Sequence, residues 1–195
     1  MVDFTFKTKP YAHQLSALEA SCDSESFALL MDMGTGKSKV LIDTITYLDK
    51  RDLINSVLIF APKGVYKNWV EKEIPAHLPD EVKYKLAYWA SPLTNKHKDA
   101  IRSIWKVDDN LHIFVMNIEA LSSGKAEEVA TKFIRSHGGR TLIVIDESTV
   151  IKNHKARRTK AAIRLAKLCA YKRILTGSPI TKTPLDLFAQ FQLSL

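Results

Sequence analysis

The sequence has few cysteines and no grouping of metal ligands. Its 195 residues include two cysteines, Cys22 and Cys169, which lie far apart and match neither a disulfide framework nor a zinc-binding spacing. None of the six histidines pairs with another at metal-ligand spacing beside cysteine partners. We therefore predict no zinc site, and we expect a reducing, cytoplasmic setting for the thiols.

Long apolar segments and repeats are also missing. No apolar run approaches the length of a membrane span, and the first residues lack the pattern of a secretory signal peptide. The chain shows no internal repeat and no low-complexity linker. These absences predict no membrane partner and a single domain over residues 1–195.

The composition is that of an ordinary globular protein with an excess of positive charge. Hydrophobic residues make up 46% and charged residues 26% of the chain, and the formal net charge is +8. A basic balance favours a polyanionic partner such as nucleic acid, because phosphate contacts release counterions. Charge alone leaves open the alternative that the protein is basic for no specific reason.

Short apolar runs alternate with helical stretches along the chain. The predicted strands are Phe27–Met31, Val57–Phe60, Lys83–Trp89, His112–Met116, Leu142–Ile145 and Arg173–Thr176. The predicted helices are Ala12–Ser21, Lys37–Lys50, Val65–Ile74, Asn95–Lys106, Lys125–His137, Lys155–Cys169 and Pro184–Leu193. Most of the strands are continuously apolar, as expected for strands buried on both faces of a parallel sheet. The alternation predicts an α/β fold with a doubly wound, mostly parallel sheet flanked by helices, whose ligands bind beyond the carboxyl ends of the strands.

A glycine-rich loop, residues Met31–Ser38, follows the first predicted strand and opens a helix. Its Gly-Thr-Gly-Lys-Ser run lets the backbone wrap a phosphate closely, and the helix N-terminus adds partial positive charge. Lys37 is expected to reach the β- and γ-phosphates of ATP, and the Ser38 hydroxyl is expected to bind Mg²⁺. The general motif has glycine where this chain has Met31. The alternative is a plain glycine turn that exposes a lysine by chance.

The apolar run Leu142–Ile145 ends directly in two carboxylates, Asp146 and Glu147. At the carboxyl edge of a parallel sheet, Asp146 is expected to hold Mg²⁺ through its water shell, and Glu147 to orient or deprotonate an attacking water. The alternative is a strand that simply ends in a polar turn. The phosphate loop upstream in the same pattern favours the catalytic interpretation.

The order of these motifs resembles superfamily 2 helicases, and within them the Swi/Snf family of double-stranded DNA translocases. Lys9–Gln14 resembles the opening segment, where a glutamine reads the adenine, and Asp32–Ser38 resembles motif I, before which a small residue usually stands in the position of Met31. Motif Ia is matched by Ala61–Lys63 together with Asn68, Trp69 and Glu73, and Asn117–Glu119 stands where the family usually has Thr-Tyr-Glu. Motif II is matched by Asp146–Thr149 together with Ile151–Asn153. Motif III is matched by Leu175–Ile180. Motif Ia is the most family-specific of these segments, and Thr149 replaces the usual histidine of motif II.

The resemblance implies a RecA-like P-loop NTPase domain that uses ATP and Mg²⁺, with Lys37, Asp146 and Glu147 as its catalytic residues. The residues implied for ATP are Tyr11, Gln14, Met33, Gly34, Thr35, Gly36, Lys37 and Ser38, with Ser38 and Asp146 for the metal. The residues implied for DNA, expected to be double-stranded, are Pro62, Lys63, Asn68, Asn117 and Lys152. The residues implied to couple nucleotide state to DNA are Thr176, Gly177 and Ser178.

The chemistry of the residues agrees with that of a motor that holds the phosphodiester backbone without reading bases. Lys63, Asn68 and Lys152 carry suitable groups, although each lysine is equally explained as a solvated surface charge. Trp69 is either a core anchor of the helix Val65–Ile74 or a DNA contact. Tyr11 either packs near the adenine or has a structural role.

Superfamily 2 motors resemble one another in having two RecA-like domains, with ATP between them and arginine fingers from the second. The chain ends about fifteen residues after motif III. We therefore expect the ATP-binding half of a motor, whose partner is a second RecA-like domain and which hydrolyses little ATP alone. Compact motif spacing and the start at Met1, just ahead of Lys9–Gln14, favour the small bacterial or phage members, and hence the cytoplasm of a bacterial or phage-infected cell.

Two other functions stay open at this point. Another P-loop NTPase, such as a kinase or a partitioning ATPase, has no need for Asn68 and Trp69 or for the Leu175–Pro179 segment. A nucleotide-binding or DNA-binding module without catalysis has no need for Lys37, Asp146 and Glu147 together.

Overall fold

The computed structural model describes residues 5–90, 92–147 and 156–177. Within these ranges six strands form one sheet in the order β1-β6-β5-β2-β4-β3, and every pairing is parallel. The strands are β1 (Ser26–Leu30), β2 (Ser56–Ala61), β3 (Tyr84–Tyr88), β4 (Leu111–Asn117), β5 (Thr141–Asp146) and β6 (Tyr171–Thr176). All six predicted strands are confirmed, with ends that differ by at most two residues.

Most of the strands are largely apolar because each side of the sheet is covered. Successive side chains of a strand point to opposite faces, so Val57, Ile59 and Ala61 of β2 pack in one core and Leu58 and Phe60 in the other. All five of these side chains are fully buried. The prediction of strands buried on both faces is therefore confirmed.

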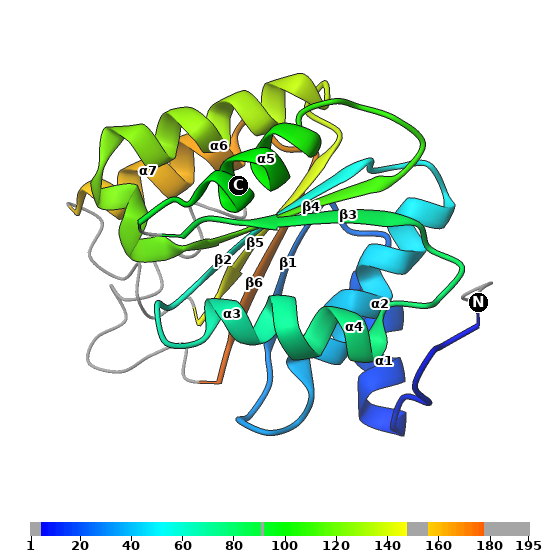
Figure 1. The fold of residues 1–195 in the computed structure, drawn as a ribbon. Coiled ribbons are helices and arrows are strands. Elements are labelled where there is room, and N and C mark those ends of the chain that lie inside the picture. Colours follow the sequence, from blue (N-terminus) through cyan, green and yellow to red (C-terminus); the bar gives the residue numbers. More distant parts are fainter. Residues whose placement is uncertain (1–4, 91, 148–155, 178–195) are drawn as a thin grey trace.

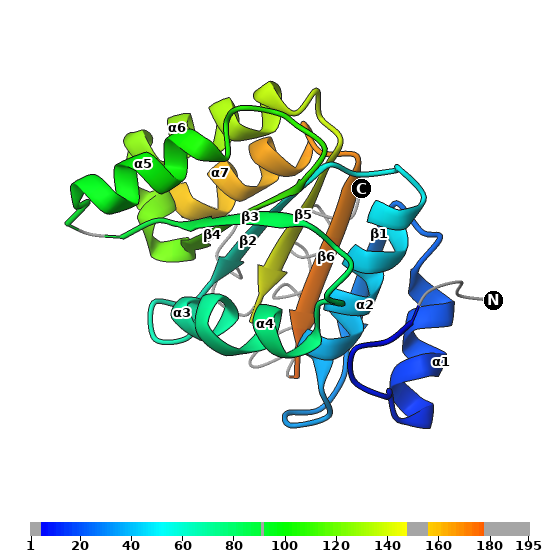
Figure 2. The same cartoon turned by 45° about the vertical axis from the view of Figure 1, so that its right-hand side comes forward.

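The helices lie in two layers, one on each face (Figure 1). One face carries α1 (Ala12–Ser21), α2 (Lys37–Lys50), α3 (Tyr66–Asn68) and α4 (Ile74–His77), and the other carries α5 (Asn95–Ser103), α6 (Gly124–Ser136) and α7 (Arg157–Ala166). Figure 2 shows the same two layers after a turn of the molecule. This arrangement confirms the predicted doubly wound fold. The predicted helix Pro184–Leu193 lies outside the described residues.

The predicted helix Val65–Ile74 is not a regular α-helix. Between α3 and α4 the chain forms a π-helical turn, η1 (Trp69–Glu73), in which Ile74 N–H donates to the Trp69 carbonyl five residues earlier. Pro75 explains the widening, because proline has no N–H and its ring crowds the carbonyl four residues before it. The Asn68 amide donates to Glu73 Oε1 at 2.9 Å and spans the widened turn.

The predicted motifs gather at one edge of the sheet because all strands are parallel. The phosphate loop follows β1, Pro62 follows β2, Asn117 ends β4, Asp146 ends β5 and Thr176 ends β6. The strand order puts β6 between β1 and β5, so motif III lies between the phosphate loop and the acidic pair. In the described part of the chain, no helix is long and apolar enough to cross a membrane.

Candidate active site

The phosphate loop depends on a glycine in the left-handed region at the start of α2. Gly36 has a φ of 82° and directly precedes the helix. A Cβ built on Gly36 would lie 2.2 Å from Gln14 Nε2. Any other residue would therefore strain the backbone and displace Gln14.

Lys37 lies folded against the loop that it follows. Its Nζ donates to the carbonyl oxygens of Met31 and Asp32, at 2.9 Å each, and Thr35 Oγ1 donates to the same Asp32 oxygen at 2.7 Å. Ser38 stands next to Lys37 in the first turn of the 14-residue helix α2. The N–H groups of that turn and the Lys37 ammonium together offer an anion several donors.

Gln14 connects the N-terminal segment to the phosphate loop. Its Oε1 accepts from Tyr11 N–H at 3.0 Å, and its Nε2 donates to the Thr35 carbonyl oxygen at 3.0 Å. His13 Nε2 donates to the same Thr35 oxygen at 3.0 Å. Gln14 is buried, and both ends of its amide are engaged with backbone. In the structure Gln14 therefore holds the phosphate loop against the N-terminal segment. Recognition of the adenine base by Gln14 stays a prediction.

A cleft of about 660 Å³ opens between the N-terminal segment and the phosphate loop. Its size lies in the range of small-ligand sites. The Tyr11 side chain is 71% exposed, and its ring stacks on His13 with centroids 5.9 Å apart. Met33 is also exposed, at the tip of the phosphate loop. The lining residues are Thr8, Lys9, Pro10, Tyr11, His13, Gln14, Gly34, Thr35, Gly36, Lys39 and His77.

The first carboxylate of motif II is held by a tryptophan. Asp146 Oδ2 accepts a hydrogen bond from Trp69 Nε1 at 2.8 Å. Burial raises the pKa of Asp146, whereas the Trp69 hydrogen bond and the charge of Lys37 act in the opposite direction. Asp146 is therefore a half-buried carboxylate that a cation would stabilise in its charged form.

Glu147 joins motif II to motif III. It has a φ of 51°, which is unusual for a residue other than glycine and is typical of strained functional positions. Thr176 Oγ1 donates to Glu147 Oε1 at 3.4 Å, and the Thr176 carbonyl accepts from Met31 N–H at 3.3 Å. A Cβ on Gly177 would lie 3.2 Å from Met33 Cγ. Motifs I, II and III are thus in direct contact.

The residues fit a magnesium ion that is bound together with a nucleotide. Ser38 and Asp146 offer the hard oxygen donors that Mg²⁺ prefers. Among the described residues no group of three or more His, Cys, Asp or Glu side chains could hold a metal ion alone. An ion here would take its remaining ligands from water and phosphate oxygens.

The predicted DNA residues Pro62, Lys63 and Asn117 lie at the ends of two neighbouring strands, β2 and β4. Lys63 N–H donates to the Glu119 carboxylate at 3.1 and 3.3 Å. Asn117 Oδ1 accepts from Ala120 N–H at 2.9 Å and so begins the 3₁₀ turn η2 (Ile118–Ser122). A cleft of about 500 Å³ at this edge is lined by Lys63, Trp89, Asn117, Glu119, Ala120, Ser122 and Ser123.

Asn68, which was also predicted to contact DNA, is not among the residues that line this cleft. Asn68 is half-buried, and its amide is directed to Glu73. Lys152 and Ser178 lie outside the described residues. The DNA role of Asn68 stays a prediction, and its observed contact braces the π turn.

Trp69 is the site residue whose role the sequence did not predict. It is buried, which decides for the core-anchor alternative, and its indole N–H also reaches Asp146. A buried indole needs an acceptor for its single N–H donor. This need for an acceptor was the only sign in the sequence that Trp69 makes a specific polar contact. The sequence does not indicate that the acceptor is Asp146, which lies 77 positions away.

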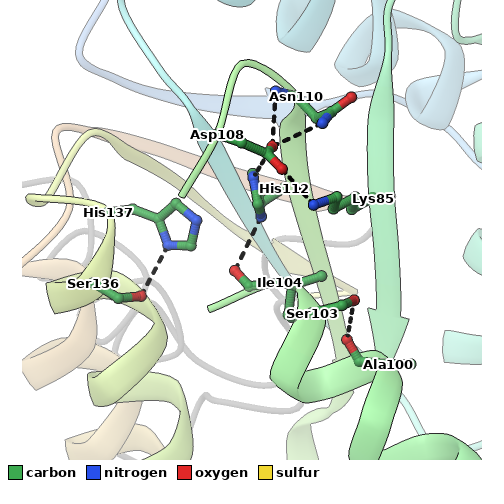
Figure 3. Close-up of polar contacts among 9 residues, drawn as sticks. All are labelled: Lys85, Ala100, Ser103, Ile104, Asp108, Asn110, His112, Ser136 and His137. Atoms are coloured by element: carbon green, nitrogen blue, oxygen red, sulfur yellow. Dashed lines mark hydrogen bonds and ion pairs between the residues drawn. The ribbon is translucent and has the colours of Figure 1, made fainter. Parts of the chain in front are cut away.

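A second polar cluster lies at the opposite edge of the sheet (Figure 3). His112 is fully buried near the start of β4, and its two ring nitrogens face acceptors at 3.0 Å, the Ile104 carbonyl and Asp108 Oδ1. The Lys85 ammonium beside Asp108 is the largest cause that holds the pKa of this carboxyl below its usual range. This cluster contains none of the predicted site residues and supports the loops at the amino edge.

Another depression on the described surface lies apart from the motifs. It measures about 770 Å³ and is lined by one face of α6, from Gly124 to Ser136. None of the residues predicted to bind ATP or DNA lines it.

The family model described as the SNF2-related domain matches residues 13–194 of this chain. The chromatin-remodeling ATPase INO80 of Schizosaccharomyces pombe is 27% identical over 169 residues, which are 81% of this chain and 9% of that protein. A Caenorhabditis elegans homologue of the SWI/SNF-related regulator of chromatin subfamily A-like protein 1 is 27% identical over 184 residues, 94% of this chain and 24% of that protein. The chain thus spans under a quarter of the length of these relatives.

Solved structures show the same fold. The Sulfolobus solfataricus SWI2/SNF2 ATPase core in complex with dsDNA superposes with a TM-score of 0.74 at 24% identity, over all of this chain and 37% of that one. The UvsW helicase of bacteriophage T4 superposes with a TM-score of 0.65 at 14% identity, over 96% of this chain and 58% of that one. These likenesses confirm the predicted RecA-like helicase fold. Together with the family match over most of its length, they show that the chain belongs to the SNF2-related domain family.

Proposed function

We propose that this chain is the ATP-binding half of a translocase that uses ATP hydrolysis to move along duplex DNA. The observation that carries the proposal is the contact of three loops: Thr176 bonds to Glu147 of motif II and to Met31 of the phosphate loop. A nucleotide bound to Lys37 would therefore affect the position of motif III through these contacts. Membership of the SNF2-related domain family supports the same function.

The catalytic residues act at the carboxyl ends of β1 and β5. Lys37 and the first N–H groups of α2 bind the β- and γ-phosphates. Ser38 and Asp146 hold Mg²⁺, which when bound neutralises charge on the phosphates. Glu147 orients the attacking water and accepts its proton. The adenine lies in the cleft beside Tyr11 and Gln14.

The DNA backbone lies along the edge formed by Pro62, Lys63 and Asn117, and Lys152 adds a further contact. The net charge of +8 favours this polyanion through phosphate contacts that are independent of base sequence. The DNA in complex with the Sulfolobus ATPase core supports a duplex substrate. Thr176, Gly177 and Ser178 transmit the nucleotide state to this edge.

A second RecA-like domain of the same full-length protein closes the cleft and contributes arginine to the phosphates. The chain alone then binds ATP weakly and hydrolyses little of it. We keep the prediction of a cytoplasmic protein of a bacterium or a phage-infected cell.

The test is ATP turnover by the full-length protein with duplex DNA, single-stranded DNA, RNA or no nucleic acid. We expect duplex DNA to stimulate most strongly. The Glu147→Gln variant should bind ATP like the wild type and lose at least 100-fold in turnover, on the order of a general-base contribution. Turnover that ignores nucleic acid would support another P-loop NTPase, and normal turnover by the variant would exclude the role of Glu147.

A further inference from the structure

Trp69 makes a contact that no motif assignment explains. Its side chain is 1% exposed, and its indole Nε1 donates to Asp146 Oδ2 at 2.8 Å across 77 positions of sequence. A buried indole N–H needs an acceptor, and many core carbonyls would serve. Here the acceptor is the carboxylate to which the proposed function gives the magnesium ion.

The helix that carries Trp69 begins at the proposed DNA edge. Val65 N–H and Tyr66 N–H both donate to the Pro62 carbonyl, at 2.8 and 3.0 Å, so α3 starts directly from the Pro62–Lys63 segment. Packed helical segments of this kind are one route by which energetic coupling between two sites is carried. Trp69 is the first residue of the π turn that follows α3.

The π turn sets the direction of the Trp69 side chain. Widening by one residue rotates the side chains of a helix relative to those of a regular α-helix, and such turns recur at functional sites. Asn68 and Glu73 stand five positions apart and are joined by a 2.9 Å hydrogen bond across the turn. Asn68, Trp69 and Glu73 all belong to the segment that resembles motif Ia.

The hydrogen bond restricts the orientation of the Asp146 carboxylate. It engages one carboxylate oxygen and so fixes the direction of the other oxygen. Hydrogen bonds of this kind from outside the coordination sphere tune metal affinity, and their loss typically costs 10–100-fold.

We propose that Trp69 is a positioning residue that orients Asp146 for the magnesium ion and links this carboxylate to the DNA edge through the helix Tyr66–His77. The proposal rests on the proposed function, because it requires that Asp146 meets magnesium and that Lys63 meets DNA. It adds a regulatory connection between the two sites that runs through motif Ia as well as through motif III.

The first test compares two Trp→Phe variants of the full chain. Trp69→Phe keeps an aromatic ring and removes the N–H donor. Trp105→Phe is the matched control, because the buried Trp105 Nε1 has no hydrogen-bond partner in the described part of the molecule. Binding of a non-hydrolysable ATP analogue is measured by calorimetry with Mg²⁺ and with EDTA. We expect Trp69→Phe to lose roughly tenfold of the Mg²⁺-dependent affinity and none of the affinity in EDTA.

A second pair of variants leaves residue 69 as tryptophan and changes Glu73 instead. Glu73→Ala removes the acceptor of the Asn68 amide, whereas Glu73→Gln retains a carbonyl oxygen that accepts it. We expect Glu73→Ala to weaken Mg²⁺-dependent binding in the same direction as Trp69→Phe, and Glu73→Gln to match the wild type. A merely structural role of the turn would instead lower affinity equally with Mg²⁺ and with EDTA.

The link to DNA is tested by repeating the Mg²⁺ titration with a duplex oligonucleotide. Because coupling of binding sites is reciprocal, duplex DNA should change the Mg²⁺ affinity of the wild type and change that of Trp69→Phe less. Wild-type behaviour of Trp69→Phe in both titrations overturns the positioning role and leaves the proposed function standing. If the wild type itself binds neither Mg²⁺–nucleotide nor DNA, the proposed function is wrong and the positioning role fails with it.

Discussion

At the scale of single residues, the site is held by side chains that each satisfy two partners. Gln14 braces both Tyr11 and Thr35, and Thr176 contacts both Glu147 and Met31. Gly36 leaves the room that Gln14 needs, since a Cβ there would overlap its amide. The phosphate loop therefore depends on a residue outside its own motif.

Gly36→Ala is predicted to destabilise the fold more than Gly34→Ala. Both glycines have a positive φ, of 82° and 78°, so both variants carry a backbone strain of about 1 kcal/mol or more. Only the Cβ at position 36 also meets Gln14, because the space around Gly34 is open. Urea unfolding of the two variants gives the difference in free energy, and equal values would contradict the clash with Gln14.

At the scale of elements, α1 is fixed to the sheet by a buried cation. Arg173, near the start of β6, is 1% exposed, and its guanidinium donates to the carbonyls of Ser21 and Ser24 at 2.8 Å. These carbonyls lie at and just beyond the C-terminal end of α1, where a positive charge is favourable. Burial lowers the pKa of Arg173 to about 10, so the side chain is charged at neutral pH. Through α1, Arg173 supports the position of Gln14.

Arg173→Met is predicted to cost about 3 kcal/mol of stability, because it leaves buried carbonyls without their charged donor. Arg164→Met on α7 is the comparison, since Arg164 is exposed and pairs with Glu127 at the surface. Exposed pairs contribute about 1 kcal/mol or less. Thermal or urea unfolding measures both, and a similar small loss in the two variants would show that Arg173 does not anchor α1.

At the scale of the whole molecule, the two edges of the sheet carry different chemistry. The carboxyl edge gathers the phosphate loop, the acidic pair and the proposed DNA contacts. The amino edge carries the buried pair His112 and His137, whose rings lie 4.8 Å apart. His137 Nδ1 donates to the Phe133 carbonyl at 2.8 Å, and its buried Nε2 has no partner among the described residues. Burial lowers the pKa of His137.

Because of His137, the free energy of unfolding is predicted to decrease as the pH is lowered below about 6.5. The unfolded chain takes up a proton there that the folded chain resists, so stability is full above the unfolded pKa and declines below it, by at most about 1.4 kcal/mol per pH unit. His77, whose pKa burial also lowers, acts with the same sign. Burial raises the pKa of Asp43 and Asp49 to about 6, and these groups act with the opposite sign.

The measurement is therefore the difference between wild type and His137→Asn in urea unfolding from pH 8 to pH 5. The shared contributions of the other groups cancel in this difference. The wild type should lose stability relative to the variant as the pH falls, and parallel profiles would contradict the role of His137.

Much of the fold was open to prediction because its signals are local. Continuous apolar runs such as Leu142–Ile145 specify strands that need cover on both faces, and the Gly-Thr-Gly-Lys-Ser run specifies a phosphate loop wherever a strand precedes it. The π-helical turn before Pro75 was not predicted, because a proline can either end a helix or distort it, and the prediction ended the helix at Ile74. The bounds of α5 and α7 also differ from prediction, because side-chain packing decides where a helix ends.

The sequence by itself determined the fold class, the phosphate loop after β1 and the acidic pair after β5, because each follows from residues adjacent in the chain. Only the tertiary structure decided which distant groups meet. The strand order brings β6 between β1 and β5, and so brings Thr176 to Glu147 and Gly177 to Met33. The packing of the helix Tyr66–His77 against the sheet brings Trp69 to Asp146. Such contacts depend on the register of buried surfaces, which no local spacing encodes.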